Sequence, residues 1–371
     1  MHPTPDPARY KKRGRGWTHT PPLGFVTKRK QKSNAILLYN RRTPHPKCSA
    51  VTTFEFYRFR FHFRARDPVR FPEGKSANVV RGAFGAVLRD TASPAAYARL
   101  FEPGSALGSA PSGLADWPRP FVLRAVHLDG LTIAAGGWFF VDVHVFDLRE
   151  PALEHFRAAF ARLGENGVGP GRGRAELDRV EQLDLADGGE TVTDKPRAPS
   201  VIGLDADPAP VNRVCVRFVT PTELKAAGGM AERPEFAILF ARLRDRISTL
   251  RAFYGAGPLD IDFRALGERA AGVRLKRADL KWERVERKSG RTGQVHSLGG
   301  FTGAAEYEGD LAEFLPWLRA ARWVGVGRQT VWGKGEVRVE SSAERPRGGG
   351  ESADVRSAQQ GRAGQNFVTL V

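Results

Sequence analysis

The chain has few cysteines, few carboxylates relative to its cations, and no long apolar run. Its 371 residues include two cysteines, Cys48 and Cys215, which excludes a disulfide framework and a cysteine zinc site. The eight histidines match no metal-site spacing, so we expect no metal and no cofactor. No stretch reaches the roughly 18 apolar residues of a membrane span, and the N-terminus lacks the apolar core of a secretory signal. We therefore expect a cytoplasmic protein with no membrane partner.

Positive charge is in excess and is concentrated near the N-terminus. The sequence has 58 Lys or Arg against 41 Asp or Glu, a net charge of +17. Such an excess favours an acidic partner, most often nucleic acid. Residues 1–50 hold twelve Lys or Arg and one carboxylate, Asp6, so we expect a basic, disordered arm there and a disordered polar tail over residues 341–371. The alternatives are that the arm is translated upstream sequence and that the other arginines reflect an arginine-rich genome.

Two glycine-rich stretches occur in matching contexts. The second, VGVGRQTVWGKGEVRVE at residues 324–340, follows a helical pattern and precedes a strand pattern; it contains Gly325, Gly327, Arg328, Gly333, Lys334 and Gly335. Backbone N–H groups beside two cations are typical of a phosphate site. The first, at residues 164–173, also lies between a helix and a strand, which indicates two related domains. The alternative is that the glycines close tight turns.

Residues 57–66, YRFRFHFRAR, alternate with a period of two. The aromatic side chains and Ala65 share one face of the expected strand, and the other carries four arginines and a histidine: Arg58, Arg60, His62, Arg64 and Arg66. A row of cations without a carboxylate repels itself unless something anionic neutralises it, so it predicts contact with phosphates. A solvated polar face is the alternative.

The order of elements predicts an α+β fold. In the first half a strand at 57–66 precedes a helix at 76–90, strands at 121–127 and 131–145, a helix from Pro151, and a strand after the first glycine loop. In the second half the elements are a strand at 213–220, a helix at 234–254, a hairpin at 280–307, a helix at 310–321 and a strand at 336–340. Asp310 and Glu313 have the spacing of a capping box. Each half is βαββαβ, so we expect two tandem ferredoxin-like domains, residues 51–205 and 206–340, with helices on one face of antiparallel sheets.

Three segments carry a resemblance to a known family. They are RGAFGAVLRD at 81–90, PSGLADWPRPFVLRA at 111–125, and the stretch from His296 to Gly335 with its glycine-rich loop. The chain resembles the CRISPR repeat-processing endoribonucleases of the RAMP superfamily, of the type with a C-terminal glycine-rich domain. The resemblance implies tandem ferredoxin-like domains that bind the repeat of precursor CRISPR RNA, with CRISPR effector subunits as further partners. It also implies cleavage without metal, in which 2′-hydroxyl attack leaves a 2′,3′-cyclic phosphate and a 5′-hydroxyl.

The resemblance guides the choice of site residues. Relatives commonly place a catalytic histidine in or beside the first helix, and residues 76–90 contain none. The candidates for proton transfer are therefore His62 on the arginine face, His296 at the start of the matching C-terminal segment, and Lys75 at the entry to the first helix. The expected RNA contacts are Arg58, Arg60, Arg64, Arg81, Gly325, Gly327, Arg328, Gly333, Lys334 and Gly335. Trp323 and Trp332 flank the loop and are secondary candidates for stacking on bases.

A second function is compatible with the same residues. A noncatalytic RAMP subunit that holds guide RNA in an effector complex shares the RNA-binding features, and the missing helix histidine favours it. The C-terminal match favours the endoribonuclease. A generic RNA-binding protein is less consistent with the sequence, because no RRM aromatic signature occurs.

Overall fold

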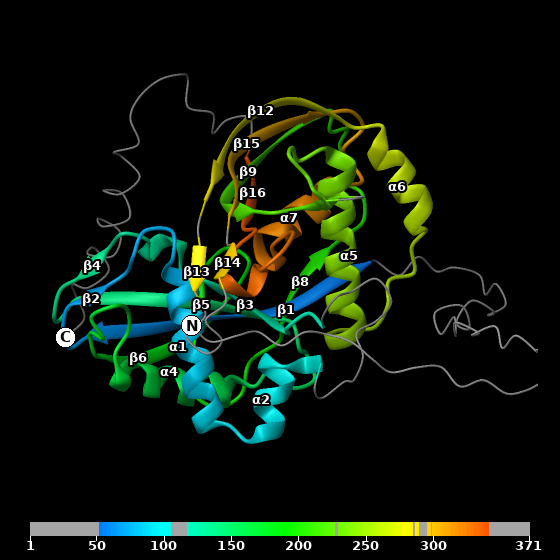
Figure 1. Cartoon of the computed structure of the whole chain (residues 1–371). Coiled ribbons are helices and arrows are strands. Elements are labelled where there is room, and N and C mark those ends of the chain that lie inside the picture. Colours follow the sequence, from blue (N-terminus) through cyan, green and yellow to red (C-terminus); the bar gives the residue numbers. More distant parts are fainter. Residues whose placement is uncertain are drawn as a thin grey trace, which may run out of the picture. The chain divides into compact units, whose positions relative to one another are not determined.

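Two antiparallel sheets, each covered by helices on one face, organise the protein (Figure 1). The computed structural model describes residues 52–104, 117–226, 229–284, 286–288, 295–297 and 299–340. The predicted arm at 1–50 and tail at 341–371 lie outside these residues. Within the described part, no helix combines the length and the apolarity needed to cross a bilayer.

The first sheet has the strand order β3-β5-β1-β6-β7, and β8 also pairs with β1. Its strands are β1 (Thr53–Ala65), β3 (Phe121–Arg124), β5 (Trp138–Val145), β6 (Ala175–Leu183), β7 (Gly189–Thr191) and β8 (Ser200–Gly203). Its helices are α1 (Ser76–Thr91), α2 (Pro94–Phe101) and α4 (Leu153–Asn166). A short pair, β2 (Val69–Arg70) with β4 (Thr132–Ile133), and a 3₁₀ turn, η2 (Val126–Leu128), complete this half.

The second sheet has the order β12-β15-β9-β16. It comprises β9 (Arg213–Thr222), β12 (Arg274–Glu283), β15 (Gly300–Glu308) and β16 (Val337–Glu340), with the helices α5 (Phe236–Tyr254), α6 (Phe263–Ala271) and α7 (Leu315–Val324). Small additions are β10 (Lys225–Ala226), β11 (Gly229–Met230), β13 (Glu286–Lys288), β14 (Val295–Ser297) and the 3₁₀ turn η3 (Thr330–Trp332). In both halves the second, third, first and fourth strands of a βαββαβ unit follow one another across the sheet. The predicted class, α+β with two tandem ferredoxin-like units, is confirmed.

The last helix begins later than its sequence pattern indicated. The capping-box prediction at Asp310 and Glu313 is wrong, because α7 starts at Leu315 with Pro316 in its first turn and Phe314 at the N-cap. Proline is favoured in a first helical turn, where its missing N–H costs nothing. Glu313 instead accepts two hydrogen bonds from Arg269 of α6, a helix that the sequence analysis did not predict.

The first glycine loop has a structural role. A Cβ atom added at Gly169 or Gly173 would overlap the backbone of Arg70 or Pro68, beside or within β2. Gly167 and Gly169 also have positive φ. Glycine is therefore required here to let the loop lie against the chain, which is the alternative that the sequence left open for this stretch.

Strand β1 belongs to two hydrophobic cores. Its first aromatic residues, Phe54 and Phe56, pack in the cluster that contains α5 and α7. Farther along, Phe59, Phe61 and Phe63 pack in the cluster that contains α1 and α4. The two hydrophobic cores thus share the strand β1, and the two sheets are joined by buried apolar surface, which disfavours free movement of one unit against the other.

Shortening a buried side chain of β1 should destabilise the whole described fold. Phe56 is fully buried, and Phe56→Ala is expected to lower the free energy of unfolding by about 3–5 kcal/mol through lost burial and a cavity. Val201 on β8 is 51% exposed, so Val201→Ala should change it by less than about 0.5 kcal/mol. Urea unfolding followed by fluorescence and circular dichroism tests both variants. Two separate transitions in Phe56→Ala, with one unchanged, would contradict a shared core.

Candidate functional site

The arginine row of β1 is neutralised within the protein. Arg60 donates to both carboxylate oxygens of Asp142 at 2.8 and 2.9 Å, and Arg58 pairs with Asp187 at 2.5 Å. Arg66 pairs with Glu176. The premise that this row lacks carboxylates is wrong, because neighbouring strands and the turn after β6 supply them. Within the described residues, Arg64 is the row's arginine without a carboxylate partner.

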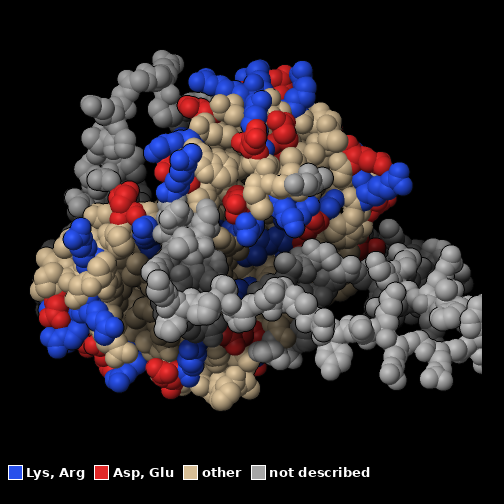
Figure 2. Space-filling view, viewed as in Figure 1, with Lys and Arg blue, Asp and Glu red and all other residues tan. Residues whose placement is uncertain are grey.

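Other basic side chains follow the same pattern. Arg328, predicted as a phosphate contact, pairs with Glu223 at 3.0 Å. Figure 2 shows Lys and Arg interspersed with Asp and Glu over the viewed face. Arg81 on α1 lies over the rings of Phe101 and Trp332, at 4.5 and 5.4 Å from their centroids. Net positive charge therefore does not by itself locate an anion site here.

His62 takes part in a small charged network. Its Nε2 lies 2.8 Å from Oε2 of Glu181, whose other oxygen accepts from Arg179 at 2.9 Å. Burial lowers the pKa of His62, and the bond to Glu181 opposes that shift. His296, the second histidine candidate, lies in β14 in register with Arg287 of β13. The surroundings of the His296 side chain lie outside the described part of the structure.

The glycines of the second loop approach the protein itself. A Cβ atom added at Gly327 would overlap the carbonyl of Glu223, and one at Gly335 would overlap that of Val326. A Cβ atom at Gly333 would overlap Cβ of Ala77, in the first turn of α1. These three glycines and Gly325 have φ between 68° and 82°. They let the loop lie directly against the start of α1, which positions the lysine that follows.

Lys334 is a buried cation without a counterion. Its relative exposure is 4%, and the described residues offer its ammonium group no hydrogen bond or ion pair. Burial lowers its pKa most, Asp129 and Glu283 raise it, and Lys75 lowers it. Most of this side chain is buried and its ammonium group has no ion pair among the described residues, so an added anion there would stabilise its charged form.

Lys75 and the N-terminus of α1 lie beside Lys334. Lys75 is exposed and occupies the N-cap position, and the first turn of α1 contains no acidic residue. The amide of Ser76 donates to Oδ1 of Asp129 at 2.9 Å. The helix dipole adds partial positive charge at this end. The structure therefore brings together two predicted residues, Lys75 and Lys334, in a setting suited to a phosphate group.

His127 is a residue that the sequence analysis missed. It lies in η2, two residues before Asp129, and is half-buried. Its Nε2 donates to the carbonyl of Phe140 at 3.0 Å, and its ring stacks on that of Phe140 with centroids 4.1 Å apart. Arg60 covers Phe140 as well, at 3.9 Å from the ring centroid. No sequence signal marked His127, because its setting depends on a strand that follows more than ten residues later.

Three donors fix the end of α7, where the glycine loop starts. Nη2 of Arg124 lies 3.5 Å from the carbonyl oxygen of residue 322, Nδ1 of His144 lies 2.8 Å from that of residue 323, and Nε of Arg246 lies 2.8 Å from that of residue 324. Trp323 is buried, and the guanidinium groups of Arg58 and Arg322 lie 4.1 and 4.2 Å from its ring centroid. That position makes Trp323 a packing residue in this structure.

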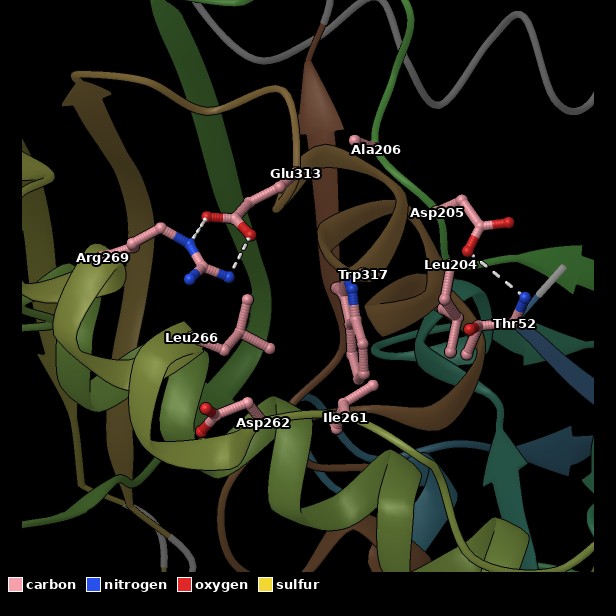
Figure 3. A pocket seen from close by; sticks show the side chains of 10 residues that line it. All are labelled: Thr52, Leu204, Asp205, Ala206, Ile261, Asp262, Leu266, Arg269, Glu313 and Trp317. Carbon is pink, nitrogen blue, oxygen red and sulfur yellow. Dashed lines mark hydrogen bonds and ion pairs between the residues drawn. The ribbon is translucent and has the colours of Figure 1, made fainter. Parts of the chain in front are cut away.

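A separate cavity of about 270 Å³ lies among α6, α7 and the segment after β8 (Figure 3). Its carboxylates already have partners. Glu313 binds Arg269, Asp262 caps α6, and Asp205 accepts from the amide of Thr52 at 3.2 Å. Elsewhere in the described residues, no three His, Cys, Asp or Glu side chains group as metal ligands would. The cavity therefore offers no uncommitted group for chemistry.

Known families match both halves of the chain. The model of the CRISPR-associated endoribonuclease Cas6 matches residues 216–337, and a model described as an N-terminal domain matches residues 54–202. No curated protein matches the chain significantly. Among solved structures, Thermus thermophilus Cas6 is 19% identical over 78% of this chain and 100% of that chain, with a TM-score of 0.47. A partial Cas6-RT-Cas1–Cas2 complex is 13% identical over 86% of this chain and 55% of that chain, with a TM-score of 0.50.

Fold and family match together define the class: a tandem ferredoxin-like protein related to the nucleases of CRISPR RNA processing. Within that class, residues 216–337 match the CRISPR-associated endoribonuclease Cas6 family, so the resemblance to CRISPR repeat-processing endoribonucleases is confirmed. The assignment to the type with a C-terminal glycine-rich domain stays a prediction. This homology supports a nuclease that acts in CRISPR RNA processing. At 13% identity, the match with a TM-score of 0.50 supports the fold alone.

The contact between the glycine loop and α1 can be tested through Gly333. Gly333→Ala adds a methyl group against Ala77 at a φ of 80°, so it should lower the free energy of unfolding by about 1–3 kcal/mol. Gly82, within α1, has open space at its Cβ position, and Gly82→Ala should raise stability by about 0.4–1 kcal/mol. Denaturant unfolding measures both. Equal stability of the two variants would contradict the close packing.

His144 should make stability fall in acid. Burial, followed by the charges of Arg124 and Arg58, holds its pKa well below the usual range, so the folded state stays neutral while the unfolded chain takes up a proton below about pH 6.5. The free energy of unfolding should therefore fall as pH drops from 7 to 5. The His144→Asn variant keeps a donor for the α7 carbonyl but cannot titrate. Its free energy of unfolding should therefore fall less with acid than that of wild type, by up to about 1.4 kcal/mol per pH unit. Parallel urea titrations of both proteins check this, and identical slopes would contradict it.

Proposed function

We propose that this protein is an endoribonuclease that binds the repeat of precursor CRISPR RNA and cuts it by attack of a ribose 2′-hydroxyl. The products are then a 2′,3′-cyclic phosphate and a 5′-hydroxyl. The Cas6 family match supports the substrate class. The observation that carries the mechanism is the unpartnered Lys334 beside Lys75 and the N-terminus of α1. The domain limits 51–205 and 206–340 belong to the same proposal.

This chemistry suits the groups that are present. A nucleophile from the substrate removes the need for one from the protein, so the protein has to position the phosphate, stabilise the phosphorane and move protons. Lys75 and the α1 amides supply charge on one side of the scissile phosphate. Lys334 approaches from the glycine loop, where its lowered pKa eases loss of a proton to the leaving 5′-oxygen. No step in this scheme requires a metal ion or a cofactor.

A noncatalytic RNA-binding subunit is the second candidate. The observation that favours it is the absence of histidine from α1, residues 76–91. In that role Lys75 and Lys334 would hold a phosphate of the guide RNA without cutting it. Other CRISPR proteins would be its partners, as the solved Cas6-RT-Cas1–Cas2 complex illustrates for a related protein.

One experiment separates these functions. Purified protein is incubated in EDTA with end-labelled repeat RNA, and with the same RNA carrying one 2′-deoxy substitution before the cut site. Cleavage of the first RNA to a cyclic phosphate and survival of the second support the enzyme. Binding of both RNAs without cleavage supports the noncatalytic subunit. Cleavage that EDTA abolishes would contradict the metal-independent mechanism.

Lys334→Met should slow cleavage strongly. The change removes the charge at the scissile phosphate but keeps most of the buried side-chain volume, and the single-turnover rate should fall by roughly 10²–10³. Lys225 is an exposed lysine on β10, so Lys225→Met should leave the rate within about threefold. Single-turnover assays at saturating protein check both. A Lys334→Met rate equal to that of the control would remove this residue from the site.

A further inference from the structure

His127 is held in one orientation by two contacts with Phe140. Its ring stacks on Phe140 at an interplanar angle of 20°, and Arg60 lies over the same phenyl ring. Arg60 is itself held by both oxygens of Asp142. The hydrogen bond to the Phe140 carbonyl prevents rotation of the imidazole about its own axis. Such fixed placement is what a proton-transfer group requires.

The same hydrogen bond determines the tautomer. A carbonyl oxygen can only accept, so Nε2 of His127 must carry the hydrogen. In the neutral ring, Nδ1 then holds a lone pair, and none of the described residues donates to it. Burial lowers the pKa of His127 and Asp142 opposes that shift, which keeps the ring neutral near pH 7. His127 is thus a neutral acceptor of protons at working pH.

The position of His127 links it to the candidate phosphate site. After η2 the chain reaches Asp129, which binds the first amide of α1 and lies within electrostatic range of Lys334. Glu336, two residues beyond Lys334, acts on the pKa of His127. His62 of β1 is in register with Phe140, and its ring centroid lies 6.1 Å from that of Phe140. The charges that act on His62 are Glu181, Arg179 and Arg60, none from the glycine loop or α1.

We infer that His127 is the general base of the cleavage reaction, an inference that rests on the proposed function. Nδ1 takes the proton from the 2′-hydroxyl as its oxygen bonds to phosphorus. The bond from phosphorus to the 5′-oxygen breaks, and that oxygen takes a proton from the Lys334 ammonium group. Water then restores the proton on Lys334 and removes the one on His127. This assignment replaces His62 in that role.

The test compares His127→Gln with His62→Gln in single-turnover cleavage of repeat RNA in EDTA. Glutamine can keep a donor toward the Phe140 carbonyl but cannot act as a base. We expect the His127→Gln rate to fall by roughly 10²–10⁴ and the His62→Gln rate to stay within about threefold of wild type. Affinity for the uncleavable 2′-deoxy RNA should be unchanged in His127→Gln, and its unfolding transition should match wild type.

The pH profile gives a readout that misfolding would not produce. Arg60 of β1, Asp142 of β5 and Glu336 before β16 are the charged groups that act on His127. With the lowered pKa of His127, the wild-type rate should level off above about pH 6.5, whereas the His127→Gln rate should rise about tenfold per pH unit as hydroxide replaces the base.

Each outcome decides the assignment. A His127→Gln variant that cleaves within about threefold of wild type, or that keeps the wild-type pH profile, overturns the role of His127 and leaves the proposed function intact. A large loss in His62→Gln with none in His127→Gln assigns the base to His62. A wild-type protein that binds both RNAs and cleaves neither overturns the proposed function and this inference together.

Discussion

The carbonyl groups at the end of α7 are the point on which the functional part of the structure depends. A helix C-terminus carries partial negative charge and unpaired carbonyl oxygens, and here the last three face donors from β3, β5 and α5. β3 and β5 belong to the first sheet and α5 belongs to the second half, so this helix end joins both ferredoxin-like units. The glycine loop begins one residue later, and its starting point is therefore set by both.

The contact of Arg124 with the end of α7 leaves part of its guanidinium group buried and not hydrogen-bonded within the described part of the chain. Nε and Nη1 of Arg124 are buried without a hydrogen-bond partner among the described residues, and the nearest carboxylate, Glu336, lies 3.8 Å from Nε. A buried guanidinium group is unfavourable unless fixed charges and dipoles surround it. The α7 terminus and Glu336 supply them only when the two units are docked. The shared strand β1, with Phe56 in one core and Phe61 in the other, keeps them docked.

Local patterns predicted the fold better than the site. The alternation in β1 and the repeated βαββαβ order follow from periodicity, which is a property of neighbouring residues. The carboxylate partners of the arginine row are not local, because Asp142, Glu176 and Asp187 lie roughly 80 to 130 residues away along the chain. The start of α7 was misjudged because a first-turn proline competed with the capping-box spacing. Each failure came from a contact or a competing local rule that the pattern alone did not weigh.

The candidate site, too, depends on contacts between segments that are distant along the chain. Lys334 was predicted as a phosphate contact because glycines in its loop could approach a ligand. In the structure these glycines approach the protein itself, and this packing places Lys334 beside α1. His127 was invisible because a single histidine before a turn has no pattern. Its orientation arises from Phe140 on β5, and Phe140 in turn is covered by Arg60 of β1. Geometry of this kind exists only after the sheet has formed.

The contrast between paired and unpaired cations locates the site more sharply than net charge does. On the polar face of the first sheet, Arg58 and Arg60 have carboxylate partners, and that face costs little in electrostatic energy. At the junction of loop and helix, Lys334 is largely buried without an ion pair among the described residues and lies near a second lysine, Lys75, and both effects disfavour its positive charge. A phosphate group would relieve both the desolvation and the repulsion there. The distribution of ion pairs among the described residues, rather than the chain's total charge of +17, is what singles out Lys334 and Lys75 as the candidate anion site.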